Sequence, residues 1–274
     1  MSQFEYLRRV SIGQYLPLDS FIHRLDPRVK IVGFSFLIIA ISISNNLYSL
    51  ILALLVSLVL IAASRIPFSF AIRGLLTPLP FLFLIATLQL VITPHAETSA
   101  AVFGVWRIQI YIEGILSALR LLLRFASLLL ILTTLTSSLS TIEMINGLDL
   151  LLKPLQKIGV PTANAVLLVQ LTLRFIPFLA LNAEKIAKSQ ASRGAKWDTP
   201  NKNLFNQVQQ IVPLVIPLFT SSLRQAENLS NAMLARGFAG NTAHTSMHTH
   251  HFSLRDGVFL MLLLITAVSI LFLF

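Results

Sequence analysis

The sequence predicts an all-α integral membrane protein with about five transmembrane helices and a module of long helices at the cytosolic face. Of its 274 residues, 55% are hydrophobic and only 12% are charged, about half the charged fraction of an ordinary soluble domain. Five apolar runs approach or exceed the roughly 20 residues that cross a bilayer. This composition excludes an ordinary soluble enzyme, a disordered tail and a nucleic-acid-binding protein, despite the formal net charge of +10.

The apolar runs define three regions. An N-terminal transmembrane region, 1–139, is followed by a cytosolic-face module, 140–252, and a C-terminal transmembrane helix, 253–274. The four N-terminal spans are expected at about 29–44, 47–63, 75–93 and 115–139. Only Asn45 and Asn46 separate the first two, which indicates a tight helical hairpin. Asp26 and Pro27 supply an N-cap and an N1 proline for the first helix.

Basic residues set the expected orientation. Segment 1–30 carries five of them, the 64–74 loop two, and the stretch 140–255 eleven, whereas the 94–107 loop carries only Arg107. Cytosolic loops of membrane proteins carry an excess of Lys and Arg. We therefore expect the N-terminus in the cytosol and the C-terminus outside, in a multi-pass protein of the cell membrane.

The module at 140–252 contains two further apolar blocks, 165–181 and 211–223. Prolines interrupt both: Pro177 in the first, and Pro213 and Pro217 in the second. The second block belongs to one helical stripe with steps of four and three residues. The residues of this stripe are Leu204, Val208, Ile211, Val215 and Leu218. Long helices at the membrane face are the preferred interpretation, and a seven-span topology is the alternative.

The two long segments end alike. Ser192-Arg193-Gly194 closes the first, and Ala235-Arg236-Gly237 closes the second. Each arginine follows a glutamate, Glu184 or Glu227, by nine positions. A glycine after a helical run is typical of a left-handed helix end, so each arginine lies in the last turn. A helix cap alone would explain either end, but the repeated spacing favours a docking function for the pair.

Other chemistry finds little support in the sequence. It contains no phosphate-binding GxxxxGK[ST] loop, no GxGxxG and no HExxH motif, and it has no cysteine. We therefore expect no catalytic residues, no cofactor and no metal site. The histidine-rich segment 244–251 is interpreted as a solvated linker. Arg120 and Arg124 lie within the fourth span, where Glu113 is a possible partner for Arg120 and both a structural and a functional role remain open.

With these residues in view, the chain resembles the T component of energy-coupling factor (ECF) transporters, the family that includes the cobalt-transport Q proteins. The N-terminal signature matches at Gly13, Tyr15, Asp19, Ser20, His23, Arg24, Leu25, Asp26, Pro27 and Arg28. The middle matches at Thr136-Ser137, Pro154-Leu155 and Arg174-Phe175-Ile176-Pro177. The two arginine ends match the Ala-Arg-Gly boxes of the family, except that Ser192 stands in place of the usual alanine.

The resemblance implies a mechanism. Family members bind two ABC-type ATPases through two crossed coupling helices, and each arginine box enters a groove on one ATPase. They also hold one small membrane S component, which captures a vitamin or a metal ion. By resemblance, Arg193 and Arg236 are the docking residues here, and Arg174, Pro177, Glu184 and Glu227 support the coupling helices. The Leu204 to Leu218 stripe would contact the S component or the neighbouring helix.

Two other functions remain open at the level of sequence. A conventional ABC importer permease would also bind ATPases, but through one short coupling helix per subunit. An intramembrane lipid-modifying enzyme would normally show clustered acidic, histidine or arginine residues at the membrane surface. The paired arginine ends favour the coupling subunit of a bacterial or archaeal importer. The transported substrate is not encoded in any motif of this chain.

Overall fold

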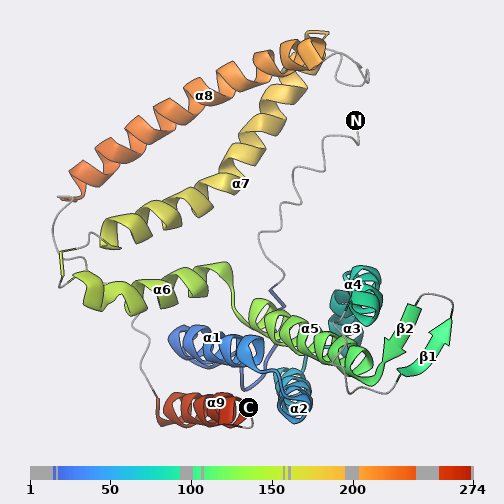
Figure 1. Ribbon diagram of the computed structural model, residues 1–274. Helices are drawn as coiled ribbons and strands as arrows, with labels where there is room; N and C mark the ends of the chain where they lie inside the picture. Colours follow the sequence, from blue (N-terminus) through green and yellow to red (C-terminus); the bar gives the residue numbers. More distant parts are fainter. Residues whose placement is uncertain are drawn as a thin grey trace. The chain divides into compact units, whose positions relative to one another are not determined.

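The fold is taken from a computed structural model, which describes residues 15–16, 18–92, 101–105, 108–156, 158–159, 162–194, 204–238 and 253–272 (Figure 1). The described elements are the helices α1 (Pro27–Ile43), α2 (Leu47–Ser64), α3 (Phe68–Leu76), α4 (Leu79–Ile92), α5 (Ile112–Ser138), α6 (Thr141–Gln156), α7 (Thr162–Ser192), α8 (Leu204–Ala235) and α9 (Leu254–Phe272), and the strands β1 (Ala101–Val105) and β2 (Ile108–Tyr111). The predicted helical class is confirmed, and the sequence analysis did not foresee the short antiparallel β1–β2 hairpin.

The described residues divide into two compact units. The first unit contains α1 to α5, the hairpin, most of α6, and α9, and the second unit contains α7 and α8. In the first unit, α1 packs against α9 and α5, and α2 packs against α5. The core side chains are apolar and almost fully buried: Ile22, Phe34, Leu37, Ile41, Leu50, Ile131, Leu263 and Ile270.

Two glycines let helices approach each other closely in the first unit. A Cβ on Gly33 of α1 would lie 2.5 Å from Leu263 Cδ1 of α9. A Cβ on Gly147 of α6 would lie 2.9 Å from Ile31 Cδ1 and 3.0 Å from Pro27 Cβ. A side chain at Gly33 would displace Leu263, and one at Gly147 would press on Ile31 and Pro27, so glycine allows α9 and α6 to lie close to α1.

Among the described residues, four helices are long and apolar enough to cross a membrane: α2, α5, α7 and α9. The pair α3 and α4 would make a fifth span, broken by a bend of 52°. One continuous run was expected at 75–93, but the helix breaks between Leu76 and Leu79, at Pro78, which cannot donate a backbone hydrogen bond. Helix α1 has 17 residues and is about 26 Å long at 1.5 Å per residue, slightly short for the expected first span.

Helix α1 begins as predicted. Asp26 is its N-cap, its side chain accepts a hydrogen bond from the backbone N–H of Arg28 at 2.9 Å, and Pro27 follows at the first helical position.

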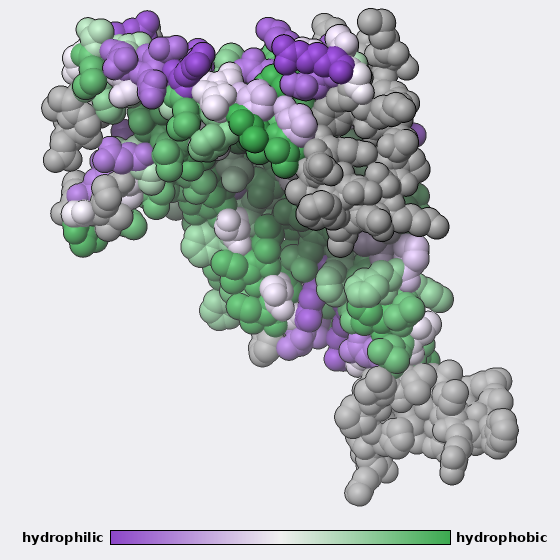
Figure 2. All heavy atoms as spheres, turned by 90° about the horizontal axis from the view of Figure 1, so that it is seen from above, coloured by the Kyte–Doolittle hydropathy of each residue, from purple (hydrophilic) through white to green (hydrophobic). Residues whose placement is uncertain are grey.

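Large apolar side chains are exposed on most of the helices, among them Ile39, Leu55, Phe81, Leu132 and Ile265. Apolar side chains spread widely over the visible face in Figure 2, and polar ones gather in separate patches. Such apolar surface is typical of a protein that lies in lipid.

Candidate docking site on the second unit

Helix α7 carries its proline in the interior. Pro177 cannot donate to the carbonyl four residues earlier, and its ring crowds that carbonyl, so a helix bends there. In Figure 1, α7 changes direction near its middle. Pro213 and Pro217 lie inside α8 in the same way. The prolines therefore shape the two long helices without ending them.

Arg193 lies at the end of α7 in the position that the sequence predicts. Gly194 has a φ of +89°, a left-handed conformation that glycine adopts without strain. The backbone N–H groups of Arg193 and Gly194 donate to Gln190 and Ala191 carbonyls at 3.0 Å, which closes the last turn. The hydroxyl of Ser192 donates to the Lys188 carbonyl at 3.0 Å, so this serine turns its polar group back onto its own helix.

Arg236 ends α8 in a complete Schellman motif. The N–H of Gly237, at a φ of +76°, donates to Leu234 at 2.9 Å, and the N–H of Phe238 donates to Met233 at 3.0 Å. Arg193 and Arg236 are both exposed, and neither forms an ion pair with a described residue. Both arginines are therefore presented to solvent at helix ends that backbone hydrogen bonds close.

The four predicted support residues behave differently from one another. Glu184 is mostly buried and forms an ion pair with Lys188, one turn further along α7, at 2.5 Å. Glu227 and Arg174 are exposed and form no ion pair with residues of the described ranges. Pro177 is exposed as well. Among the described residues, no hydrogen bond or ion pair joins any of these four to Arg193 or Arg236, so their support of the helices stays a prediction.

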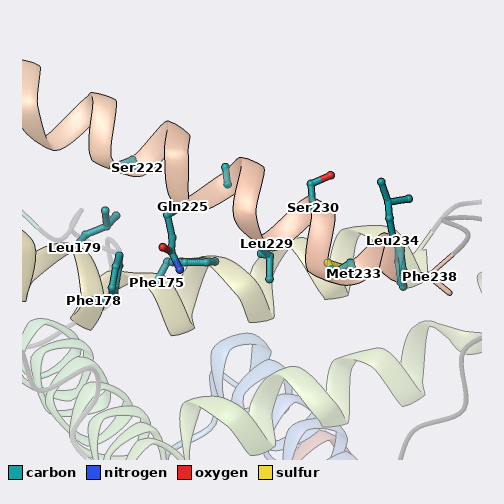
Figure 3. Close-up of a pocket in the computed structure, with 11 residues that line it drawn as sticks. Phe175, Phe178, Leu179, Ser222, Gln225, Leu229, Ser230, Met233, Leu234 and Phe238 are labelled. Atoms are coloured by element: carbon teal, nitrogen blue, oxygen red, sulfur yellow. The ribbon is translucent and has the colours of Figure 1, made fainter. Parts of the chain in front are cut away.

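A groove of about 340 Å³ lies between α7 and α8 (Figure 3). Phe175, Phe178 and Leu179 line it from α7, and Leu229 and Met233 line it from α8. Phe238, the residue that closes the Schellman motif, lines it too. The sequence analysis noted the Arg-Phe-Ile-Pro motif but not this contact between its region and the second arginine end. The groove joins segments about 50 residues apart, so the motif by itself did not indicate it.

The apolar stripe on α8 is only part of a wider apolar face. Ile211 and Val215 are about half exposed, as expected for an uncovered stripe, and Leu218 is partly buried. Val212, Ile216 and Phe219 are exposed as well, 41%, 59% and 62% respectively, and they form a second row beside the first. The side chains of Leu204 and Val208 lie outside the described ones. The exposed face is therefore broader than the single stripe that the spacing predicted.

Several residues of the N-terminal signature form a polar network in the first unit. Lys30, fully buried, donates from Nζ to the carbonyls of His23 at 2.8 Å and Ser138 at 3.1 Å. The N–H of Asp26 donates to Asp256 Oδ1 at 3.1 Å, which joins the starts of α1 and α9. These contacts link parts of the chain that lie far apart in sequence, so spacing alone could not predict them.

His23 is held in one tautomer within this network. A carbonyl only accepts, so His23 Nε2 donates to Leu16 O at 3.1 Å, and Nδ1 accepts from the hydroxyl of Ser20 at 2.7 Å. Burial lowers the pKa of His23, and the ammonium of Lys30 lowers it further. Both effects favour the neutral ring that these two hydrogen bonds require.

Of the two arginines in the predicted fourth span, Arg124 forms hydrogen bonds with another part of the first unit. Arg124 Nη2 donates to the carbonyl of Ser44 and to Asn45 Oδ1, the latter at 2.7 Å, so it ties α5 to the turn between α1 and α2. No ion pair joins Glu113 to Arg120 among the described residues.

The histidine segment 244–251 lies outside the described residues. Within the described residues, no group of three or more His, Asp or Glu side chains is placed to hold a metal ion.

Comparisons with known proteins identify the family of this chain. The family profile described as cobalt transport protein, CbiQ, matches residues 19–249. The energy-coupling factor transporter transmembrane protein EcfT of Clostridium kluyveri is 36% identical over 267 residues, 97% of each chain. The protein of the same name is 33% identical over 262 residues in Bacillus subtilis, 96% of this chain and 97% of that one. In Heliobacterium modesticaldum it is 37% identical over 243 residues, 88% of each. The chain therefore belongs to the cobalt transport protein family.

Proposed function

We propose that this chain is the transmembrane coupling subunit of an ECF-type importer and catalyses no reaction itself. It would bind two ABC-type ATPases and one small membrane S component, and transmit the ATP-driven motion of the ATPases to the S component. The substrate would be a vitamin or a metal ion bound by that component. The protein would lie in a bacterial or archaeal cell membrane with its N-terminus in the cytosol.

The observation that carries this proposal is the pair of arginine ends. Each arginine stands at a helix terminus, exposed and without an ion-pair partner among the described residues, beside a glycine at positive φ. A guanidinium can form two parallel hydrogen bonds with a carboxylate or with backbone carbonyls. Two such ends on separate helices suit two copies of a similar partner groove.

The exposed apolar face of α8 supports the second half of the proposal. Ile211, Val215, Ile216 and Phe219 expose 48% to 62% of their surface to solvent in the isolated chain. Burial of such side chains would favour association by about 1.5–3 kcal/mol each before the costs of binding. We propose that this face holds the S component or another membrane helix.

The experiment exchanges both arginines for glutamate. In affinity-tagged full-length chain purified from its native membranes, Arg193→Glu with Arg236→Glu should abolish co-purification of the ATPases. Loss of one hydrogen-bonded charge at an interface costs about 2–5 kcal/mol, so each single variant should retain a weakened complex. Arg224→Glu is the matched control, because Arg224 is an exposed arginine of α8 away from the helix end.

The outcomes separate the competing functions. Stoichiometric ATPase on the double variant would refute docking through the arginine ends. ATPases without any small membrane partner on the wild-type chain would favour a conventional permease. If no ATPase co-purified with the wild-type chain, the paired arginine ends would serve only as helix caps, and the intramembrane enzyme would become the favoured alternative.

A further inference from the structure

We propose that a cleft in the first unit binds the headgroup of an aminophospholipid, phosphatidylethanolamine, from the surrounding membrane. The cleft measures about 1010 Å³ and is lined by the segment before α1, the end of α2, the start of α9, and Glu143 of α6. It contains none of the residues of the arginine ends or of the groove between α7 and α8. This inference is independent of the proposed coupling function.

Two arginines of the cleft would bind the phosphate group of the lipid. Arg65, just after α2, and Arg255, in the first turn of α9, both line the cleft and are exposed. Neither forms an ion pair with any residue that the structure describes. Arg65 has a φ of +54° because it is the left-handed C-cap of α2, with its backbone N–H bonded to the Ala62 carbonyl. Two unpaired guanidinium groups in one cleft favour a phosphate ligand.

Carboxylates of the same cleft would bind the ammonium group of the lipid. Asp26 is only 5% exposed; its Oδ1 lies 3.9 Å from Arg28 Nε, and its Oδ2 has no hydrogen-bond partner among the described residues. A buried acceptor without a donor is costly, and an ammonium group carries three donors. Asp19, Glu143 and Asp256 also line the cleft, so a purely anionic ligand would meet repulsion. A headgroup with both a phosphate and an amine matches both signs of charge.

The apolar surface next to the cleft favours a lipid over a soluble ligand. Leu254 adjoins Arg255 and is 89% exposed, and Val258, Met261 and Ile265 continue along the same side of α9 with 66% to 69% exposure. Their spacing of three and four residues places them in one row. Phe21, which lines the cleft, is 52% exposed. A ligand with its head in the cleft would therefore lay an acyl chain along α9.

The test measures which lipid the full chain retains. The purified, delipidated protein is mixed with equal amounts of phosphatidylethanolamine, phosphatidylcholine and phosphatidylglycerol that carry the same acyl chains, and bound lipid is counted by native mass spectrometry. We expect about tenfold more phosphatidylethanolamine than phosphatidylcholine, because choline has the same charge but no N–H donor, and a hydrogen bond to a charged group is worth about 1.5–3 kcal/mol.

Two variants test separately the roles of the two arginines and of Asp26. Arg65→Ala with Arg255→Ala should lose most of the retained lipid of every kind. Asp26→Asn keeps an oxygen for the N-cap of α1 and should lose only the preference for ethanolamine over choline. Arg73→Ala is the control, because Arg73 is an exposed arginine of α3 outside the cleft, and it should retain lipid like the wild type.

Four results would overturn the proposal. Equal retention of the three lipids by the wild type would remove the specificity, and a preference for phosphatidylglycerol would remove the role of the amine. Wild-type retention by the double arginine variant would place the lipid elsewhere. Displacement of the lipid by an equal concentration of soluble glycerophosphoethanolamine would assign the cleft to a soluble ligand.

Discussion

Lys30 illustrates how a single buried charge can organise several segments. Its Nζ satisfies one carbonyl before α1 and the carbonyl of Ser138 at the end of α5. The C-terminus of a helix carries partial negative charge, so a cation is favourable there. From the sequence, Lys30 was only one of the basic residues that set the orientation. Its burial makes it a structural residue as well.

We predict that Lys30→Met strongly destabilises the first unit. The substitution keeps the length of the side chain but leaves the His23 and Ser138 carbonyls without their donor, at a cost of about 2–5 kcal/mol. The thermal unfolding midpoint in detergent should fall, together with the yield of folded protein. Lys153→Met, at an exposed lysine of α6, is the matched control. Equal midpoints for the two variants would contradict the assigned role.

The second prediction at this scale concerns His23. Burial and the charge of Lys30 lower the pKa of His23 in the folded chain, while Glu143 acts in the opposite direction and the ring of Tyr15 lies 6.1 Å away. The unfolded chain therefore takes up the proton at higher pH than the folded chain. The contribution of neutral His23 to stability is complete above about pH 6.5 and is lost as the pH falls below that value.

His23→Gln tests this contribution. Glutamine cannot titrate, yet it can still donate and accept hydrogen bonds. The difference in unfolding midpoint between wild type and variant should be largest above pH 7 and should shrink toward pH 5. A difference that is constant over this range would show that His23 does not titrate in the folding equilibrium.

At the scale of elements, Pro177 sets the path of α7. Pro177→Leu restores a backbone donor inside the helix and removes the clash of the ring, so the two halves of α7 should straighten. We predict that substrate uptake falls while the ATPases remain bound, because both arginine ends stay intact. Uptake in cells and co-purification would be measured on the same strain. Unchanged uptake would show that the bend is dispensable.

The elements also show what the sequence could and could not predict. Continuous apolar runs located α1, α2, α5 and α9 to within a few residues, and Gly194 and Gly237 marked the helix ends correctly. The apolar run at 75–93 did not indicate the break at Pro78, because hydropathy does not record that proline lacks a backbone N–H donor. The groove beside Phe238 and the network of Lys30 depend on contacts between distant segments, which no local pattern encodes.

At the scale of the whole molecule, two units of different construction share one chain. The first unit has a buried core and two helix starts joined through Asp26 and Asp256. In the second, α7 and α8 contact each other yet leave most of their apolar side chains partly or fully exposed. The two units therefore differ in how much of their apolar surface the chain itself covers.

The topology of the whole chain yields the last prediction. The sequence has no cysteine, so single cysteines can be introduced without altering any other residue. With five spans and a cytosolic N-terminus, Ser69→Cys, Ser192→Cys and Ser230→Cys should react with a membrane-impermeant maleimide only after the cells are opened, and Asn45→Cys should react in intact cells. Helix α7 is long and apolar enough to span. If α7 and α8 both crossed, Ser192→Cys would react in intact cells, which would establish seven spans, place one arginine end outside and remove it from any cytosolic ATPase.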